Sequence, residues 1–140
     1  AGAGEELATL RGKLAGKAQF IGLVPGANTR GLRAAGLTQA ADLSGAKAVY
    51  ALVSDDGVSG KMAEALKDAD FVALQASYMT PLTEGADVVL PSAVWSERSG
   101  TITSTEGREQ PVVAALPPLG EAKADETILR ELATQLGVSV

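Results

Sequence analysis

The sequence predicts an α/β fold: a Rossmann-like, mostly parallel sheet with flanking helices, followed by a terminal β excursion and a C-terminal helix. Three observations support it. Short apolar runs alternate with stretches whose apolar residues recur at helical spacing, the runs are nearly continuous in apolar character, and 46% of the 140 residues are hydrophobic. Strands separated by helices pair in parallel through right-handed crossovers. Parallel strands are covered on both faces and therefore read as apolar runs.

The first elements follow from apolar spacing and from breaker residues. Leu7, Leu10 and Leu14 form one helical stripe, and Gly16 ends it. An apolar run then stops at Pro25, as a buried strand does. The elements expected in this part are helices over 5–14, 29–35 and 38–43, and a strand over 18–24.

Later strands are recognised in the same way. The first of them ends in a turn that contains Asp55 and Asp56, and Ser59 is expected to cap the next helix, whose buried face carries Met62 and Leu66. These strands are expected at 46–53, 70–75 and 87–90.

After Pro91 the pattern changes. Residues 101–104 alternate and favour β structure, and a turn at 106–108 precedes another β-prone pair, which predicts an extended excursion or hairpin. The last helix is expected over 125–136. Residues 1–91 thus form the Rossmann-like part and 92–140 the excursion and final helix, together a single domain or a fragment of a larger subunit.

Composition excludes several classes of function. A net charge of −5 with scattered basic residues argues against nucleic-acid binding, and no apolar run approaches the length of a membrane span. Cys and His are both absent, so the sequence provides no thiolates for iron–sulphur clusters, no usual zinc ligands and no histidine base. We therefore assign no catalytic residue and no metal ligand, and the composition fits a reducing compartment.

Three local features allow two interpretations each, and a fourth is interpreted in one way. The turn at 25–31 lies where a phosphate meets backbone amides, but a plain turn between strand and helix is preferred because the dinucleotide spacing is lacking. Asp55 and Asp56 suit a cation, and also an ordinary turn, which is preferred. Trp95, the only tryptophan, could stack on a flat cofactor, but packing between layers is preferred. The charges at 97–98 and 106–108 are interpreted as structural ion pairs.

A family resemblance rests on the second half of the sequence. The run ADVVLPSAVWSERSGTITSTEGREQ at 86–110 resembles the hallmark of the prokaryotic molybdopterin oxidoreductase family, and 118–125 with 128–137 resembles its usual continuation. Within the family, the Glu106-Gly107-Arg108 turn and the Asn-x-x-Gly segment at 28–31 are most similar to the C-terminal part of the large iron–sulphur subunit of NADH-quinone oxidoreductase. Ser54-Asp55-Asp56 stands where molybdenum enzymes carry Gly-x-Asn-Pro.

The resemblance implies a non-catalytic scaffold segment of an electron-transferring oxidoreductase, similar to that large iron–sulphur subunit and inactive alone. No cofactor is expected on this chain, and iron–sulphur clusters are expected on the rest of the subunit or complex. The implied partners are other domains or subunits of an oxidoreductase complex. The implied location is the cytoplasm, or the peripheral arm of a membrane-bound complex.

Two alternatives stay open. In the first, the chain is a segment of a formate dehydrogenase-like enzyme that contacts molybdopterin guanine dinucleotide. By resemblance, the residues nearest that cofactor would be Thr101, Thr103, Glu106 and Arg108, whereas Ser104 departs from the asparagine usual in the family. In the second, the chain is a stand-alone nucleotide-binding module that uses the turns at 25–31 and 55–56.

Overall fold

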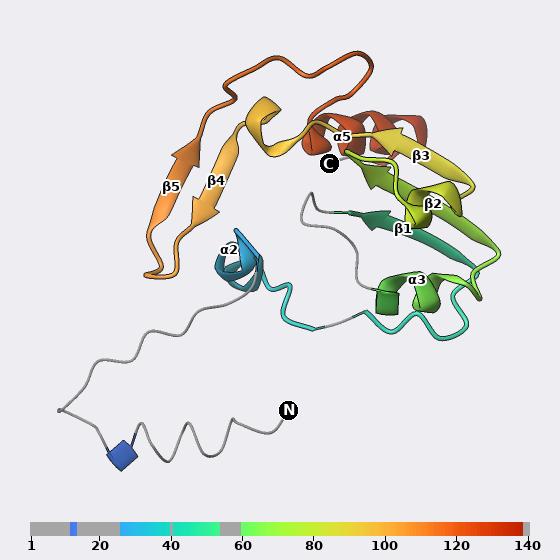
Figure 1. Ribbon diagram of the computed structural model, residues 1–140, viewed down its shortest axis with the longest axis horizontal. Coiled ribbons are helices and arrows are strands. Elements are labelled where there is room, and N and C mark those ends of the chain that lie inside the picture. Colours follow the sequence, from blue (N-terminus) through green and yellow to red (C-terminus); the bar gives the residue numbers. More distant parts are fainter. Residues whose placement is uncertain (1–11, 14–25, 40, 54–59, 139–140) are drawn as a thin grey trace.

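A computed structural model describes residues 12–13, 26–39, 41–53 and 60–138 (Figure 1). Residues 12 and 13 are helical. The rest of the helix expected over 5–14, the strand expected over 18–24, the Asp55/Asp56 turn and the Ser59 cap lie outside the described residues.

Three parallel strands form the main sheet: β1 (Ala48–Leu52), β2 (Phe71–Ala76) and β3 (Val88–Pro91). Their spatial order is β1-β2-β3, with Val49 opposite Val72 and Leu74 opposite Val89. Asp87 fixes the start of β3, because its backbone N–H donates to the Val72 carbonyl and its carboxylate accepts from the Val72 N–H at 2.7 Å. The parallel α/β arrangement that the apolar runs predict is confirmed.

Two short helices connect these strands. α3 (Gly60–Leu66) links β1 to β2, and α4 (Pro81–Glu84) links β2 to β3. The helix α4, which apolar spacing does not predict, begins at a reciprocal cap. The Thr80 N–H donates to the Thr83 hydroxyl at 2.6 Å, and the Thr83 N–H donates to the Thr80 hydroxyl at 3.4 Å. Such a cap satisfies N–H groups that the first turn of a helix leaves without partners.

The helix expected over 29–35 is present as α2 (Thr29–Ala34), but the one expected over 38–43 is wrong. Within 38–39 and 41–43 the chain has no helical turn. The Asp42 carboxylate instead accepts the Ser44 N–H at 3.0 Å, an Asx turn that competes with helix, and Leu37 is 66% exposed. The turn therefore replaces a helix at the end of this segment, where Leu43 still packs against the core.

The core lies on one face of the main sheet. Leu66 of α3 packs with Val72 and Leu74 of β2, and Leu74 is fully buried. The opposite face carries α5 (Asp125–Gln135), whose Ile128 and Ala133 are buried (Figure 1). α5 confirms the predicted final helix, and the two covered faces explain why the strands read as apolar runs.

The excursion is a separate antiparallel hairpin. It follows a short 3₁₀ helix, η1 (Trp95–Glu97), and consists of β4 (Gly100–Thr103) and β5 (Glu109–Val112), with Gly107 at φ +85° in the turn. The chain then returns to the main sheet, where the Ala93 N–H donates to the Lys123 carbonyl at 2.8 Å. This bridge places the first turn of α5 beside the end of β3 (Figure 1). The predicted hairpin is confirmed.

None of the helices in the described part of the chain has the length and apolar character that crossing a bilayer requires.

Candidate functional site

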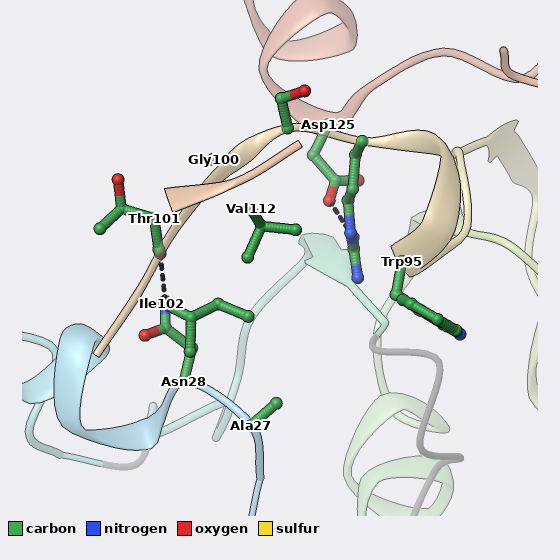
Figure 2. Close-up of a pocket in the computed structure, with 10 residues that line it drawn as sticks. Ala27, Asn28, Trp95, Gly100, Thr101, Ile102, Val112 and Asp125 are labelled. Atoms are coloured by element: carbon green, nitrogen blue, oxygen red, sulfur yellow. Dashed lines mark hydrogen bonds and ion pairs between the residues drawn. The ribbon is translucent and has the colours of Figure 1, made fainter. Parts of the chain in front are cut away.

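A pocket of about 310 Å³ opens where α2, η1, β4 and the start of α5 converge (Figure 2). Its lining brings together segments that are far apart in the sequence. The polar and aromatic side chains among its lining residues are Asn28, Trp95, Arg98, Ser99, Thr101 and Asp125.

Asn28 holds one wall of the pocket in place. Its side-chain amide donates from Nδ2 to the Thr101 carbonyl at 3.4 Å and accepts at Oδ1 from the Thr103 N–H at 2.9 Å. The opposite edge of β4 is paired with β5, so Asn28 pairs with backbone groups that the hairpin itself leaves open. Asn28 therefore attaches the start of α2 to β4 rather than capping its own helix.

An ion pair crosses the other side of the pocket. Arg98, which follows η1, donates from Nη1 to Asp125 Oδ2 at 2.6 Å, and the two side chains are 32% and 29% exposed. Asp125 also lies in the first turn of α5, where the helix dipole favours a negative charge. Partial exposure screens the pair, so we take its contribution to folding as about 1 kcal/mol.

Behind this pair lies a polar group inside the sheet. Gln75 of β2 is 1% exposed; its Nε2 donates to Asp125 Oδ1 at 2.6 Å, and its Oε1 accepts from the Tyr50 hydroxyl. Burial, and in second place the charge of Asp125, raise the pKa of Tyr50 above its ordinary value of 10.0. The phenol is therefore protonated at neutral pH and acts as the donor to Gln75.

Trp95 lies at the edge of the pocket with 70% of its surface exposed (Figure 2). The preferred expectation, that it packs between layers, is wrong, because this residue lies in a 3₁₀ turn with most of its surface exposed. An exposed indole is a large aromatic surface of the kind on which planar ligands stack.

The structure separates the four residues that the resemblance singles out. Thr101 lines the pocket, and Thr103 is half-buried with its N–H bound to Asn28. Glu106 and Arg108 lie at the hairpin turn, outside the pocket lining, where their side chains pair at 3.1 Å with 72% and 74% exposure. The Ser104 hydroxyl accepts the Arg108 N–H at 3.2 Å and so stabilises the same turn.

Sequence reasoning missed most of the partners in this site. It grouped Arg98 with Glu97, but the Glu97 carboxylate accepts the Val94 N–H at 3.2 Å and helps to start η1. Arg98 instead pairs with Asp125, 27 residues away. Gln75 carried a usable signal, because a glutamine in an apolar strand must bond to something when buried.

The described residues give no support to the two other candidate binding sites. The turn at 25–31 leads into a helix of only six residues, and its Asn28 amide is bound to β4. The Asp55/Asp56 turn lies outside the described part of the chain. Among the residues that are described, acidic side chains nowhere gather in a group of three able to hold a metal ion.

The model of the molybdopterin oxidoreductase family matches residues 3–135, nearly the whole chain.

Individual relatives are similar over shorter stretches. The F420-dependent formate dehydrogenase subunit alpha of Methanocaldococcus jannaschii is 44% identical over 86 residues, 61% of this chain and 13% of the relative. A putative formate dehydrogenase of Bacillus subtilis is 37% identical over 97 residues, 66% of this chain and 10% of the relative. A nitrate reductase of Symbiobacterium thermophilum is 45% identical over 67 residues, 48% of this chain and 9% of the relative. The chain thus spans about a tenth of the length of these relatives.

Proposed function

Because the chain belongs to the molybdopterin oxidoreductase family, we propose that its pocket beside Trp95 and Arg98 receives the guanine nucleotide end of a molybdopterin guanine dinucleotide. In this proposal the chain is a segment of the large subunit of a formate dehydrogenase-like oxidoreductase. It binds and orients, and we assign it no catalytic residue. When bound, the dinucleotide supplies the pterin-held metal at which electrons are transferred.

The chemistry of the pocket supports this assignment. Binding sites for small molecules occupy about 300–1,000 Å³, so a pocket of about 310 Å³ suits one nucleotide and not a whole dinucleotide. The exposed indole of Trp95 offers a stacking surface, and Arg98 and Asp125 offer donors and acceptors to the polar edge of a base or to a phosphate. The one observation that carries the proposal is this pairing of an exposed aromatic face with a fixed ion pair.

The four residues that the family resemblance singles out also have roles in this proposal. In this proposal Thr101, which lines the pocket, contacts the nucleotide, and Thr103 holds β4 through Asn28. Glu106 and Arg108, at the hairpin turn, would meet the part of the cofactor that extends beyond the pocket. The rest of the subunit and its partner subunits would supply the other walls and the iron–sulphur clusters.

The relatives favour this proposal over a cofactor-free scaffold like that of NADH-quinone oxidoreductase. Two of those described above carry formate dehydrogenase in their names, and one is named a subunit alpha. Metal analysis of the parent complex separates the two proposals: molybdenum or tungsten at one atom per large subunit is expected here, and its absence would favour the cofactor-free scaffold.

The pocket itself is tested by titrating the 140-residue chain with guanosine monophosphate. Trp95 is the only tryptophan, so its fluorescence reports the pocket alone. We expect saturable quenching with a dissociation constant of about 1 mM, a free energy of about −4 kcal/mol, because this chain supplies only part of the site. Arg98→Ala should weaken the quenching, and Arg130→Ala, an exposed arginine of α5, should not. Quenching that rises linearly and equally in all three proteins would rule the pocket out as a nucleotide site.

A further inference from the structure

A series of three hydrogen bonds joins β1 to the pocket. The Tyr50 hydroxyl donates to Gln75 Oε1, Gln75 Nε2 donates to Asp125 Oδ1 at 2.6 Å, and Arg98 Nη1 donates to Asp125 Oδ2 at 2.6 Å. Arg98 and Asp125 line the pocket. Tyr50 instead lines an apolar groove of about 430 Å³ between the sheet and Leu132 and Leu136. The series therefore begins on one side of α5 and ends at the pocket.

The direction of the bonds is fixed by Asp125. A carboxylate only accepts, so Gln75 must present its NH₂ group to Asp125 and its carbonyl oxygen to the phenol, which therefore donates. Gln75 is 1% exposed and cannot exchange either partner for water without cost. If the phenol hydroxyl were absent, the Gln75 carbonyl oxygen would lose this partner inside the protein, and the amide would be held by Asp125 alone.

Arg98, at the end of this series of bonds, is the residue whose side chain must be positioned. Arg98 follows a three-residue 3₁₀ helix and has a long side chain with many rotamers. Asp125 can hold it in one place only if the carboxylate is itself fixed, and Gln75 bonds to the oxygen that faces away from Nη1. The conformation of Arg98 is thus linked to the Tyr50 hydroxyl, which belongs to β1.

We infer that Tyr50 and Gln75 are positioning residues that orient Arg98 through Asp125 for ligand binding. Neither of them is among the described residues that line the pocket. The effect on nucleotide binding rests on the proposed function. The effect on the orientation of Arg98 rests on the hydrogen bonds alone.

Tyr50→Phe tests the inference because it removes one hydroxyl and keeps the ring in the apolar groove. The protein also contains a matched control, since its only other tyrosine, Tyr78, is 55% exposed and lies outside this series of bonds. We expect Tyr50→Phe to weaken binding of guanosine monophosphate about fivefold, the effect of one lost hydrogen bond, and Tyr78→Phe to leave it unchanged. In an Arg98→Ala background, Tyr50→Phe should have no further effect, because the residue that it positions is gone.

A second readout needs no ligand. A guanidinium held by a carboxylate rotates slowly about its Nε–Cζ bond, so NMR should resolve separate Nη signals for Arg98. Tyr50→Phe should merge these signals at a lower temperature than in the parent protein, and Tyr78→Phe should not. Unchanged Arg98 signals in Tyr50→Phe would overturn the inference. So would a loss of nucleotide affinity on Tyr50→Phe that is as large in the Arg98→Ala background as in the parent protein. If the parent protein does not bind the nucleotide, the proposed function fails, and the Arg98 signals still decide whether Tyr50 positions it.

Discussion

The side-chain amide of Asn28 occupies the space that a Cβ atom on Gly31 would need. The same amide binds the backbone of β4 at Thr101 and Thr103. The Asn-x-x-Gly spacing therefore has a local physical reason: glycine leaves room one helical turn away for the asparagine that attaches α2 to the hairpin.

Gly31→Ala should release this attachment. The new methyl group displaces the Asn28 amide, which is the flexible end of a side chain, so the cost is the loss of its bonds to β4. Alanine favours the helix by about 0.5–1 kcal/mol, which offsets much of that loss in global stability. The sensitive measurement is amide hydrogen exchange at Thr103, which we expect to accelerate about tenfold. In an Asn28→Ala background Gly31→Ala should leave that rate unchanged, and a fully protected Thr103 in the single variant would contradict the explanation.

Leu74→Ala tests the core of the main sheet. Leu74 is fully buried between β1 and β3, so its truncation should lower the free energy of unfolding by about 3 kcal/mol. Urea denaturation measures the loss. The control is Leu119→Ala, at a residue that is 82% exposed, where a change within about 0.5 kcal/mol is expected. Equal losses at the two positions would mean that the core does not lie where the structure puts it.

Trp95→Ala should separate binding from folding. The indole is 70% exposed, so the free energy of unfolding should change by no more than about 0.5 kcal/mol. Stacking on a base contributes about 1–3 kcal/mol, so binding of guanosine monophosphate should weaken at least about fivefold. Ligand-observed NMR provides the measurement, since the variant has no tryptophan fluorescence. A large loss of stability with normal binding would show that Trp95 packs structurally instead.

The fold was largely predictable because the signals for it are local. The apolar runs of β2 and β3, the turn at Gly107 and the stripe of α5 each lie within one stretch of sequence. The site was not predictable, because its contacts join distant residues: Asn28 meets Thr103 across 75 positions, and Gln75 meets Asp125 across 50. No periodicity encodes such pairs. The predicted helix over 38–43 failed for a different reason: the Asp42 carboxylate bonds the Ser44 N–H and forms a local turn that apolar spacing does not reveal.

Arg108→Ala should leave both stability and nucleotide binding unchanged within about 0.5 kcal/mol. Its ion pair with Glu106 is exposed, and exposed pairs contribute little. Thr101→Val, within the pocket lining, should weaken binding of guanosine monophosphate about threefold by removing a hydroxyl. Calorimetric titration of both variants checks the contrast. An effect of Arg108→Ala as large as that of Thr101→Val would move the nucleotide site toward the hairpin turn.

Alkaline pH should lower the free energy of unfolding, because the Tyr50 phenol ionises. Burial, followed by the charge of Asp125, raises the pKa of this phenol above 10.0, so the folded state favours the protonated form more strongly than the unfolded state does. Its stabilising effect is complete below pH 10 and is lost as the pH rises through the folded pKa. Phenolate absorbance of Tyr78→Phe should therefore titrate above pH 10, and adding Asp125→Asn should lower the midpoint. A midpoint at or below 10 would contradict the assignment of Tyr50 as a partly buried donor.

The nucleotide site is tested most directly by NMR of the 140-residue protein with guanosine monophosphate. Intermolecular nuclear Overhauser effects should join the ligand to the indole protons of Trp95 and to the methyl group of Thr101, and none should involve Glu106 or Arg108. Contacts confined to the hairpin turn, or none at all at saturating ligand, would contradict the assignment of this pocket.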